Sequence, residues 1–333
     1  MGLAEQAVVV RVPATSANLG PGFDTLGLAL RLHDEVEVRL AGSRLDIEVD
    51  GEGAAGLAGD GESHLIVRAI RVAFDQLDIA QPAGLALRCL NRIPHGRGLG
   101  SSAAAIVAGL LAARALAGAA TGPQDVLPLA AMLEGHPDNV APCLFGGLTI
   151  AWVADTPDTP GTPGALGWAA AADGLPRARA VRLDPSPEVH PVVFVAPEPV
   201  STRVARGLLP AAVPHADAAR NAGRAALLIA ALTTCPEVLL DGTEDKLHQD
   251  YRAPAMPHSY DLVTRLRAAG VPAVVSGAGP SVLAFLAGKP GRDELARLDS
   301  IAEETGIEWH ISPLAVERQG ASVVPSASSA RSC

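Results

Sequence analysis

The stretch PHGRGLGSSAA, residues 94–104, decides how this chain is organised, because it joins a strand-like segment to a long apolar, helix-like segment. Its glycines allow backbone angles that other residues avoid, so consecutive N–H groups can converge on one anion. The following helix adds the positive end of its dipole, and Ser101 and Ser102 place two hydroxyls there. This pattern predicts a phosphate-binding turn. It lacks the lysine of the GxxxxGK[ST] pattern, so a loop-to-helix junction without a ligand is the alternative.

The composition narrows the class of protein. The chain has 333 residues, 48% of them hydrophobic, which suits about two domains with a sizeable core. A formal net charge of −10 without any run of basic residues argues against a nucleic-acid-binding surface. We therefore expect small-molecule partners. Lysine occurs only at Lys246 and Lys289, so arginine is left to bind anions.

Cysteine usage and the N-terminus indicate a reduced cytoplasm. Cys89, Cys143, Cys235 and Cys333 show no CxxC or metal-finger spacing. The first residues lack the basic and apolar regions of a signal peptide. The apolar stretch 103–120 is interrupted by Arg114, so it predicts a buried helix and no membrane span.

Hydrophobic periodicity predicts an α+β chain with a first domain over residues 1–153 and a second over 181–318. In the first domain we expect strands at 8–12, 26–32, 35–40, 45–49, 85–90 and 148–153, and helices at 64–77, 103–120 and 124–133. In the second we expect strands at 189–195, 273–275, 282–286 and 309–311, and helices at 217–232, 259–269 and 292–305. Ser63 is the expected N-cap of the first helix, and Gly135 with Pro137 is expected to end the third. The Pro- and Gly-rich stretch 154–180 is the predicted crossover, and 319–333 a disordered tail.

Three further segments carry polar residues in constrained turns. PATSANLGPGFD (13–24) follows the first strand, EGHPDN (134–139) follows a helix, and SGAGPS (276–281) joins two apolar strands. Each has a structural alternative: a loop bonded to its own backbone, a helix termination and a hairpin turn.

Taken together, these four segments resemble the GHMP kinase family, named for its galactokinase, homoserine kinase, mevalonate kinase and phosphomevalonate kinase members. PHGRGLGSSAA is similar to the family's phosphate loop and SGAGPS to its C-terminal glycine motif. PATSANLGPGFD and EGHPDN resemble the branch that phosphorylates homoserine. Mevalonate kinases carry a lysine and a GEH signature near the start, where this chain has SANLG. The resemblance implies a two-domain GHMP kinase fold, with an S5 domain 2-like N-terminal domain, a ferredoxin-like C-terminal domain and an active site between them.

The resemblance also implies an ATP site with magnesium. Ser102 and Glu134 would ligate Mg²⁺, a hard ion that prefers oxygen ligands. The expected ATP-binding residues are Pro94, His95, Gly96, Arg97, Gly98, Leu99, Gly100, Ser101, Ser102, Ala103 and Ala104 in the turn, and Gly277, Gly279 and Ser281 opposite.

By the same resemblance the second substrate is L-homoserine, phosphorylated by ATP to O-phospho-L-homoserine in threonine biosynthesis. The expected substrate residues are Asp24 for the ammonium, Asn139 with Asn18 for the hydroxyl, Arg206 and Arg252 for the carboxylate, and Thr202 in the segment STRVAR. An arginine fork can hold a carboxylate through two parallel hydrogen bonds. Without the resemblance, solvent-exposed arginines are the alternative for Arg206 and Arg252.

Phosphoryl transfer proceeds through a loose transition state, so positioning supplies most of the catalysis. Asn139, Asp138 and Glu134 are the expected catalytic residues, although the sequence does not decide whether Asp138 is a base or orients Asn139. His136 is another candidate, with capping of a helix end as the alternative. A GHMP kinase for another alcohol and a nucleotide sensor without turnover are the rival functions. A homodimer is a further expectation from the family.

Overall fold

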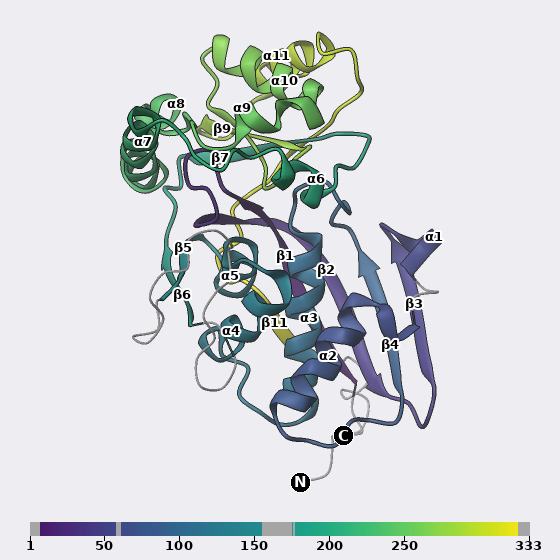
Figure 1. Cartoon of the computed structure of the whole chain (residues 1–333). Coiled ribbons are helices and arrows are strands. Elements are labelled where there is room, and N and C mark those ends of the chain that lie inside the picture. The colour runs from purple at the N-terminus through teal and green to yellow at the C-terminus, as the bar shows by residue number, and fades with distance from the viewer. Residues whose placement is uncertain (1–6, 58–60, 155–174, 176, 326–333) are drawn as a thin grey trace.

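The computed structural model describes residues 7–57, 61–154, 175 and 177–325. They form two halves, each built on one β-sheet, stacked one above the other (Figure 1). The predicted α+β class is confirmed. None of the helices in these residues is long and apolar enough to cross a membrane.

The lower half contains a seven-stranded sheet. Its strands are β1 (Val8–Ala17), β2 (Leu26–Leu40), β3 (Leu45–Gly51), β4 (Leu85–Asn91), β5 (Leu148–Val153), β6 (Ala178–Leu183) and β11 (Ser322–Pro325). The order is β11-β1-β2-β4-β3, and β5 pairs with β2 and with β6. Only β3 and β4 pair in parallel among these described strands. The segments expected as two strands at 26–32 and 35–40 form the single strand β2, because its pairing with β1 continues across both.

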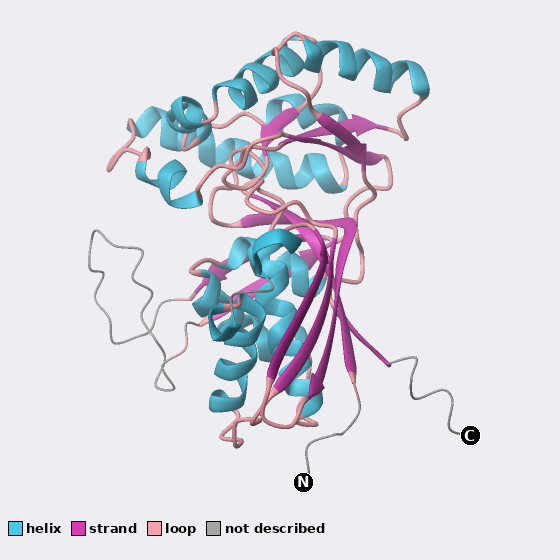
Figure 2. Cartoon of the chain, turned by 90° about the vertical axis from the view of Figure 1, so that its right-hand side faces the viewer, coloured by secondary structure: helices cyan, strands magenta, loops and turns pink. Residues whose placement is uncertain are grey.

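Helices cover one face of this sheet (Figure 2). They are α2 (Leu65–Gln76), α3 (Ser101–Leu116), α4 (Pro123–Glu134) and α5 (Pro137–Phe145), and the short α1 (Ala54–Leu57) follows β3. The helix α3 is apolar on nearly all sides and buried, as its composition predicts. A Cβ on Gly109 would lie 2.6 Å from the carbonyl oxygen of Ile66, so this glycine lets α3 pack closely on α2. The N-terminus of α3 is thereby fixed at the upper edge of the sheet, next to the second half (Figure 1).

The upper half contains a four-stranded antiparallel sheet of order β10-β7-β9-β8. Its elements are β7 (Val189–Val195), α6 (Thr202–Gly207), α7 (His215–Thr233), α8 (Leu239–Gly242), α9 (Gln249–Arg252), α10 (Pro257–Ala268), β8 (Ala273–Val275), β9 (Val282–Ala287), α11 (Arg292–Glu303) and β10 (His310–Pro313). Val192 and Phe194 pack with α10 and α11, while Val193 and Phe285 join the core of the lower half together with α7. Burial on both faces explains why β7 and β9 read as continuous apolar runs.

Three expectations are corrected. Gly135 ends α4 as expected, but Pro137 also begins α5, a helix that was not expected, because proline at the first helical position needs no N–H partner. Ser63 is not the N-cap of α2; His64 holds that position, without a side-chain cap. The tail 319–333 was expected to be disordered, but Ser322–Pro325 forms β11 and pairs with β1. Residues 326–333 lie outside the described part of the chain.

The division between the halves also differs from the expected domain boundaries. The strand β6 lies across the expected boundary at residue 181, yet it pairs with β5 of the lower sheet. The lower sheet therefore includes β6, from the expected boundary, and β11, from the expected tail. Most of the expected crossover, residues 155–174 and 176, lies outside the described residues, and the domain names that the resemblance implies stay predictions.

Candidate active site

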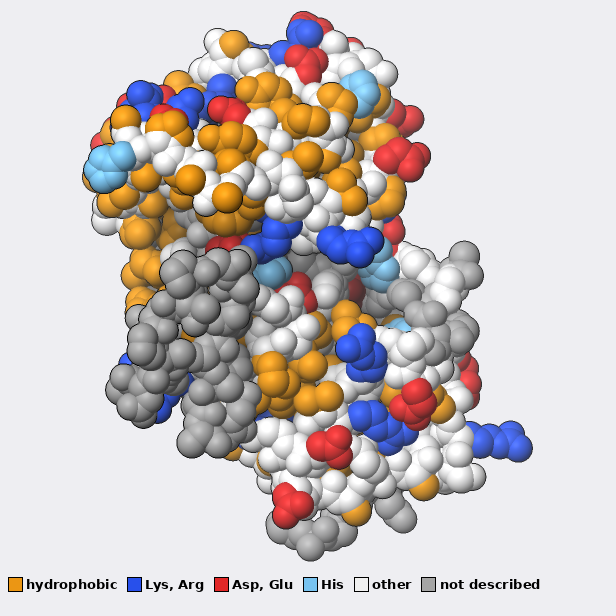
Figure 3. All heavy atoms as spheres, in the orientation of Figure 1, with side chains coloured by type: hydrophobic (Ala, Val, Ile, Leu, Met, Phe, Trp, Pro, Cys, Tyr) orange, Lys and Arg blue, Asp and Glu red, His pale blue; other side chains and the backbone are white. Residues whose placement is uncertain are grey.

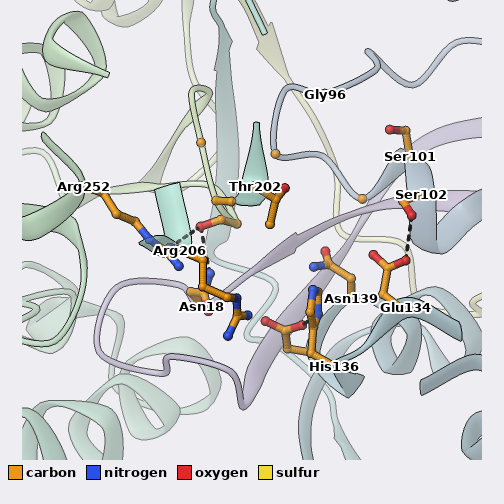
Figure 4. A pocket seen from close by; sticks show the side chains of 16 residues that line it. Asn18, Gly96, Ser101, Ser102, Glu134, His136, Asn139, Thr202, Arg206 and Arg252 are labelled. Carbon is orange, nitrogen blue, oxygen red and sulfur yellow. Dashed lines mark hydrogen bonds and ion pairs between the residues drawn. The ribbon is translucent and has the colours of Figure 1, made fainter. Parts of the chain in front are cut away.

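A cavity of about 290 Å³ lies between the two halves. Figure 3 shows the hollow, with basic side chains at its upper edge and acidic and histidine side chains in its depth. It is lined by Asn18, Gly96, Gly98, Gly100, Ser101, Ser102, Glu134, His136, Asp138, Asn139, Thr202, Arg206, Arg252, Gly277, Ala278 and Gly279. All four sequence motifs therefore meet in one place, and Figure 4 shows their side chains converging on the cavity.

The glycine-rich turn before α3 forms one wall. Gly96, Gly98 and Gly100 have φ values of 66°, 72° and 71°, in the left-handed region that favours glycine. A Cβ on Gly98 would lie 2.2 Å from the carbonyl oxygen of Ser276, so the turn packs directly on the β8–β9 turn. The first N–H groups of α3 have no partner within the helix. They open onto the cavity at the positive end of the helix dipole, which suits an anion.

Arg97, by contrast, does not face the cavity with its side chain. Its Nε donates to the carbonyl oxygen of Ala196 at 2.8 Å, Nη1 donates to that of His95 at 3.2 Å, and Nη2 donates to that of Pro197. The guanidinium therefore ties the turn to the upper half of the molecule.

The β8–β9 turn, residues 276–281, forms the opposite wall. The N–H of Gly277 donates to the carbonyl oxygen of Ala17 at 3.0 Å. The Ser276 hydroxyl lies 2.8 Å from that of Ser16 and 2.7 Å from the Gly98 carbonyl oxygen. These contacts fix the two glycine-containing turns against each other.

Asn18 lines the cavity but uses its side-chain amide on the backbone. Its Nδ2 donates to the carbonyl oxygen of Gly277 at 2.8 Å, and its Oδ1 accepts from the N–H of Asp24 at 2.9 Å. Its φ of 67° shows the left-handed conformation that asparagine tolerates. Asn18 therefore shapes the loop that carries Asp24.

The junction of α4 and α5 supplies the acidic part of the cavity. Gly135, with φ 88°, ends α4 just after Glu134. The Ser102 hydroxyl donates to Glu134 Oε2 at 2.7 Å. Burial raises the pKa of Glu134, and the Ser102 hydrogen bond only partly opposes this rise. The partly buried Glu134 carboxylate and the Ser102 hydroxyl together offer two kinds of oxygen ligand for a metal ion.

His136 and Asp138 form a second pair at this junction. His136 Nδ1 is hydrogen-bonded to Asp138 Oδ1, and Asp138 is buried. Burial alone would lower the pKa of His136, but the hydrogen bond and charge of Asp138 outweigh it and raise the pKa to about 9. The carboxylate of Asp138 is therefore paired with the positively charged imidazole of His136.

Two arginines face the cavity from the upper half. Arg206 donates to Asp24 through Nη1 at 3.0 Å and Nη2 at 2.8 Å, a bidentate ion pair. Arg252 is 2% exposed, and among the described residues no carboxylate lies within 4.0 Å of it. Burial and then the charge of Arg206 lower the pKa of Arg252. The charges of Asp24, Asp245 and Asp138 only partly oppose this fall, so an anion bound against the buried guanidinium would stabilise it further.

Neutral groups hold Arg252 in place. Its Nη1 donates to His248 Nδ1 at 3.2 Å and to the Gly277 carbonyl oxygen at 3.3 Å. His248 Nε2 in turn donates to the Gly20 carbonyl oxygen at 2.8 Å, which leaves Nδ1 as the acceptor. Burial lowers the pKa of His248, consistent with a neutral ring. The guanidinium also lies 5.2 Å from the Phe23 ring centroid.

Several expected residues lie outside the cavity wall. These are Asp24, Pro94, His95, Arg97, Leu99, Ala103, Ala104 and Ser281. Asp24 remains adjacent through its ion pair with Arg206. His95 and Ala104 line a second cavity of about 210 Å³, which shares Ser101 and Ser102 with the first.

Three residues at or beside the site, Thr15, Phe23 and His248, were not expected there from the sequence. Thr15 and Phe23 lie inside the motif PATSANLGPGFD, but the motif alone does not show that these two residues contact the site. His248 stands four residues before Arg252 on one helical turn, a spacing that places both side chains on the same face.

Comparisons with known proteins agree with these motifs. Residues 64–147 match the GHMP kinases N terminal domain. The chain is 54% identical over 322 residues to a homoserine kinase of Streptomyces coelicolor, covering 96% of this chain and 95% of that protein. It is 48% identical to a homoserine kinase of Leifsonia xyli, covering 96% and 93%.

Solved structures show the same fold. A homoserine kinase of Cytophaga hutchinsonii superposes with a TM-score of 0.76 at 27% identity, covering 97% of this chain and 99% of that one. A mevalonate kinase superposes with a TM-score of 0.60 at 12% identity, covering 93% and 99%, a likeness of fold alone.

Proposed function

Since this chain belongs to the homoserine kinases of the GHMP kinase family, we propose that it transfers the γ-phosphoryl group of ATP to the hydroxyl of L-homoserine, giving O-phospho-L-homoserine and ADP. The observation that carries the proposal is the buried Arg252, which has no ion-pair partner in the described residues, beside the Asp24–Arg206 pair. A zwitterion would match this set of charges, because its carboxylate meets two cations and its ammonium meets one anion.

Asp24 adjoins the substrate end of the cavity through its ion pair with Arg206. A carboxylate has about four lone-pair directions, so Asp24 can accept from Arg206 and still accept from an ammonium. Arg252 makes its hydrogen bonds within the described residues through Nη1, so its Nη2 group is left as a donor for the carboxylate of the substrate. Thr202, on the first turn of α6, completes this end with a hydroxyl.

The other end suits ATP. The N–H groups of the glycine-rich turn and of the first turn of α3 would hold the phosphates, with Gly277 and Gly279 as the facing wall. The second cavity adjoins this turn and is lined partly by Leu65 and Ile66, so it would take the adenine. Arg97 has no direct role in this scheme, because its donors are bonded to backbone carbonyls.

Ser102 and Glu134 fit magnesium by the chemistry of their oxygen atoms. Among the described residues, no cluster of three or more His, Cys, Asp and Glu side chains forms a complete metal site. One carboxylate and one hydroxyl are nevertheless the protein share expected for Mg²⁺, which takes its other ligands from phosphates and water. A cation beside Glu134 would also favour the charged form of this carboxylate, whose pKa is raised. The ion would offset the charge that develops on the phosphates during transfer.

Positioning then accounts for catalysis. Figure 4 shows Asn139 between Glu134 and His136, where it can contact the acceptor hydroxyl. Asp138 is bonded to His136, so its charge holds this junction together. The loose transition state of phosphoryl transfer requires little early deprotonation of the alcohol.

The test is ADP release by the purified chain with ATP and Mg²⁺, offered L-homoserine, mevalonate, shikimate and galactose in turn, with the product mass measured. We expect turnover with L-homoserine alone. Turnover of another alcohol in its place would sink the assignments of Asp24, Arg206 and Arg252, and silence with all four would favour a nucleotide sensor.

The proposal includes a cytoplasmic enzyme of threonine biosynthesis. Cys89, Cys143 and Cys235 are free thiols, which suits a reducing compartment. Cys333 lies outside the described residues. The homodimer stays a prediction from the family.

A further inference from the structure

Thr15 carries a buried hydroxyl that contacts Asn139, a residue of the cavity wall, and the proposed function gives it no role. It lies in β1 and is fully buried. Its N–H donates to the Leu99 carbonyl oxygen at 3.0 Å, and its Oγ1 donates to Asn139 Oδ1 at 2.8 Å. Thr15 therefore joins the glycine-rich turn to the first turn of α5.

This hydrogen bond determines which end of the Asn139 amide faces the cavity. A buried hydroxyl proton needs an acceptor, because leaving it unbonded costs about 1–3 kcal/mol. Asn139 Oδ1 is the acceptor that the structure gives Thr15. A side-chain amide has its acceptor oxygen and its donor nitrogen on opposite sides. With Oδ1 held by Thr15, the Nδ2 group is the part of Asn139 that is left for a ligand.

We propose that Thr15 is a positioning residue that keeps Asn139 oriented as a hydrogen-bond donor to the acceptor alcohol. This inference rests on the proposed function, because it gives Asn139 the hydroxyl oxygen of the substrate as its partner. An amide nitrogen cannot accept a proton, so Asn139 in this orientation places the attacking oxygen and does not remove its proton. Neither Thr15 nor Asn139 carries a charge at any stage of the proposed reaction.

The glycine-rich turn supports this arrangement. A Cβ on Gly100 would lie 2.0 Å from Thr15 Oγ1 and 3.2 Å from Asn139 Oδ1. The pair therefore lies directly beneath the first turn of α3, where the phosphates are expected. A hydrogen bond that orients Asn139 beside the expected phosphates would act on the geometry of attack, and small displacements of reacting groups reduce rates strongly.

The test uses three variants of the full-length chain. Thr15→Val keeps the shape and removes the hydroxyl, Thr15→Ala removes it without branching, and Thr15→Ser keeps the hydroxyl and removes a methyl group. We expect kcat for L-homoserine to fall about tenfold or more in the Val and Ala variants, with both KM values within about twofold of the wild type. We expect Thr15→Ser to retain at least half of the wild-type kcat.

A role in packing alone predicts the opposite order. In that case Thr15→Val, which preserves volume, would keep the wild-type kcat and Thr15→Ser would be the impaired variant. That result would overturn the proposal, as would a fall in kcat of the same size in all three variants.

A measurement without turnover separates this inference from the proposed function. The side-chain NH₂ resonances of Asn139, assigned by their loss in Asn139→Asp, should shift in Thr15→Val and remain in place in Thr15→Ser. Unchanged resonances in Thr15→Val would overturn the hydrogen bond itself. If the wild-type chain does not phosphorylate L-homoserine while the resonances still shift in Thr15→Val, the hydrogen bond exists but the proposed function is contradicted. The role of Asn139 toward that alcohol would then be contradicted as well.

Discussion

Arg252 shows how a single residue can favour binding at the expense of folding. Its guanidinium is almost wholly buried, and its partners in the described residues are a neutral imidazole, a carbonyl oxygen and an aromatic face. None of these cancels its charge. We expect the substrate to supply the anion that does so. Without it, the desolvation of Arg252 lowers the stability of the folded chain.

We therefore expect Arg252→Met to separate activity from stability. The KM for L-homoserine should rise by more than about tenfold, because the buried cation is lost. The Tm should not fall, because an apolar side chain of similar length replaces an unpaired charge. Steady-state kinetics and calorimetry measure the two effects, with the dissociation constant for ATP expected to stay near the wild-type value.

Arg267→Met is the matched control for this variant. Arg267 is partly buried, and it donates to Thr243 Oγ1 at 2.7 Å and to the Leu240 carbonyl oxygen at 2.8 Å, away from the cavity. We expect this variant to lose stability and keep its KM. Equal KM values in the two variants would contradict the role given to Arg252.

The pair of His136 and Asp138 predicts a pH dependence of stability. The folded state holds the pKa of His136 at about 9, against 6.5 for the ordinary side chain. Between these values the folded state binds the additional proton, so the free energy of unfolding falls as the pH rises, by about 3 kcal/mol in all. Below pH 6.5 the contribution is fully present. Urea unfolding at intervals from pH 6 to 9.5 measures it.

Other histidines act outside that window. Burial lowers the pKa of both His33 and His248, so their contributions change below pH 6.5 and have the opposite sign. Asp138→Asn removes the charge that holds the His136 proton and should flatten the profile between pH 6.5 and 9. A flat or rising profile in the wild-type chain would show that His136 does not keep its proton.

Residues whose roles depend on contacts between distant segments of the chain could not be predicted from the sequence. The motif PATSANLGPGFD led to Asn18 and Asp24, but Thr15 is a strand residue whose pattern indicates packing. Its partner Asn139 lies 124 positions away, and only the packing of α5 on β1 brings the two together. The bonding of Arg97 to the upper half depends in the same way on contacts that no local pattern contains.

At the scale of elements, the periodicity of apolar residues predicted the bounds of several strands, whereas single glycine or proline residues did not predict every helix. The strands at 148–153, 189–195 and 273–275 have the bounds expected of them. The helix α5 was missed because EGHPDN contains two opposite signals, a glycine that ends one helix and a proline that begins the next. Only two residues separate the helices, and this short connection places Glu134 and Asn139 in the same cavity.

The helix α3 offers a test with its control at the opposite end. Gly100 precedes its first residue and Gly118 follows its end, and both have positive φ, 71° and 65°. Alanine at either position carries a backbone penalty of about 1 kcal/mol. A Cβ on Gly118 meets nothing within 4 Å, whereas one on Gly100 meets Thr15 Oγ1 at 2.0 Å.

We expect Gly118→Ala to be less stable by about 1 kcal/mol with kcat unchanged. Gly100→Ala should lose more stability, and its kcat should fall by more than about tenfold because the Thr15–Asn139 pair is displaced. Urea unfolding and steady-state kinetics on both variants give the comparison. The outcome that speaks against this reading is a folded Gly100→Ala chain with wild-type kcat.

At the scale of the whole molecule, the end of the described chain returns to its beginning. Residues Val8 to Arg11 pair with Pro325 to Ser322, so β11 forms an edge of the lower sheet. The sequence did not predict this strand, because SVVP is short and lies in a polar, small-residue stretch. Such a strand depends on a partner already in place, which local propensity does not report.

Deleting the chain from Ser322 onward should lower the Tm relative to a deletion that begins after Pro325. The second deletion keeps all four β1–β11 pairs, so the difference between the two isolates the contribution of β11. We expect a difference of about 2–4 °C for each kcal/mol that the strand contributes. Calorimetry on both proteins measures it, and equal Tm values would mean that β11 adds nothing to the stability of the fold.

The seam between the 276–281 turn and the first strand bears on how molecules move through the cavity. Ser16, Ala17 and Asn18 each make a hydrogen bond to this turn, which also contacts Gly98. Swinging the halves apart like a clamshell would break all of these bonds at once. We therefore expect ligands to enter and leave without separation of the halves, past the short helix α6, whose Thr202 and Arg206 line the cavity.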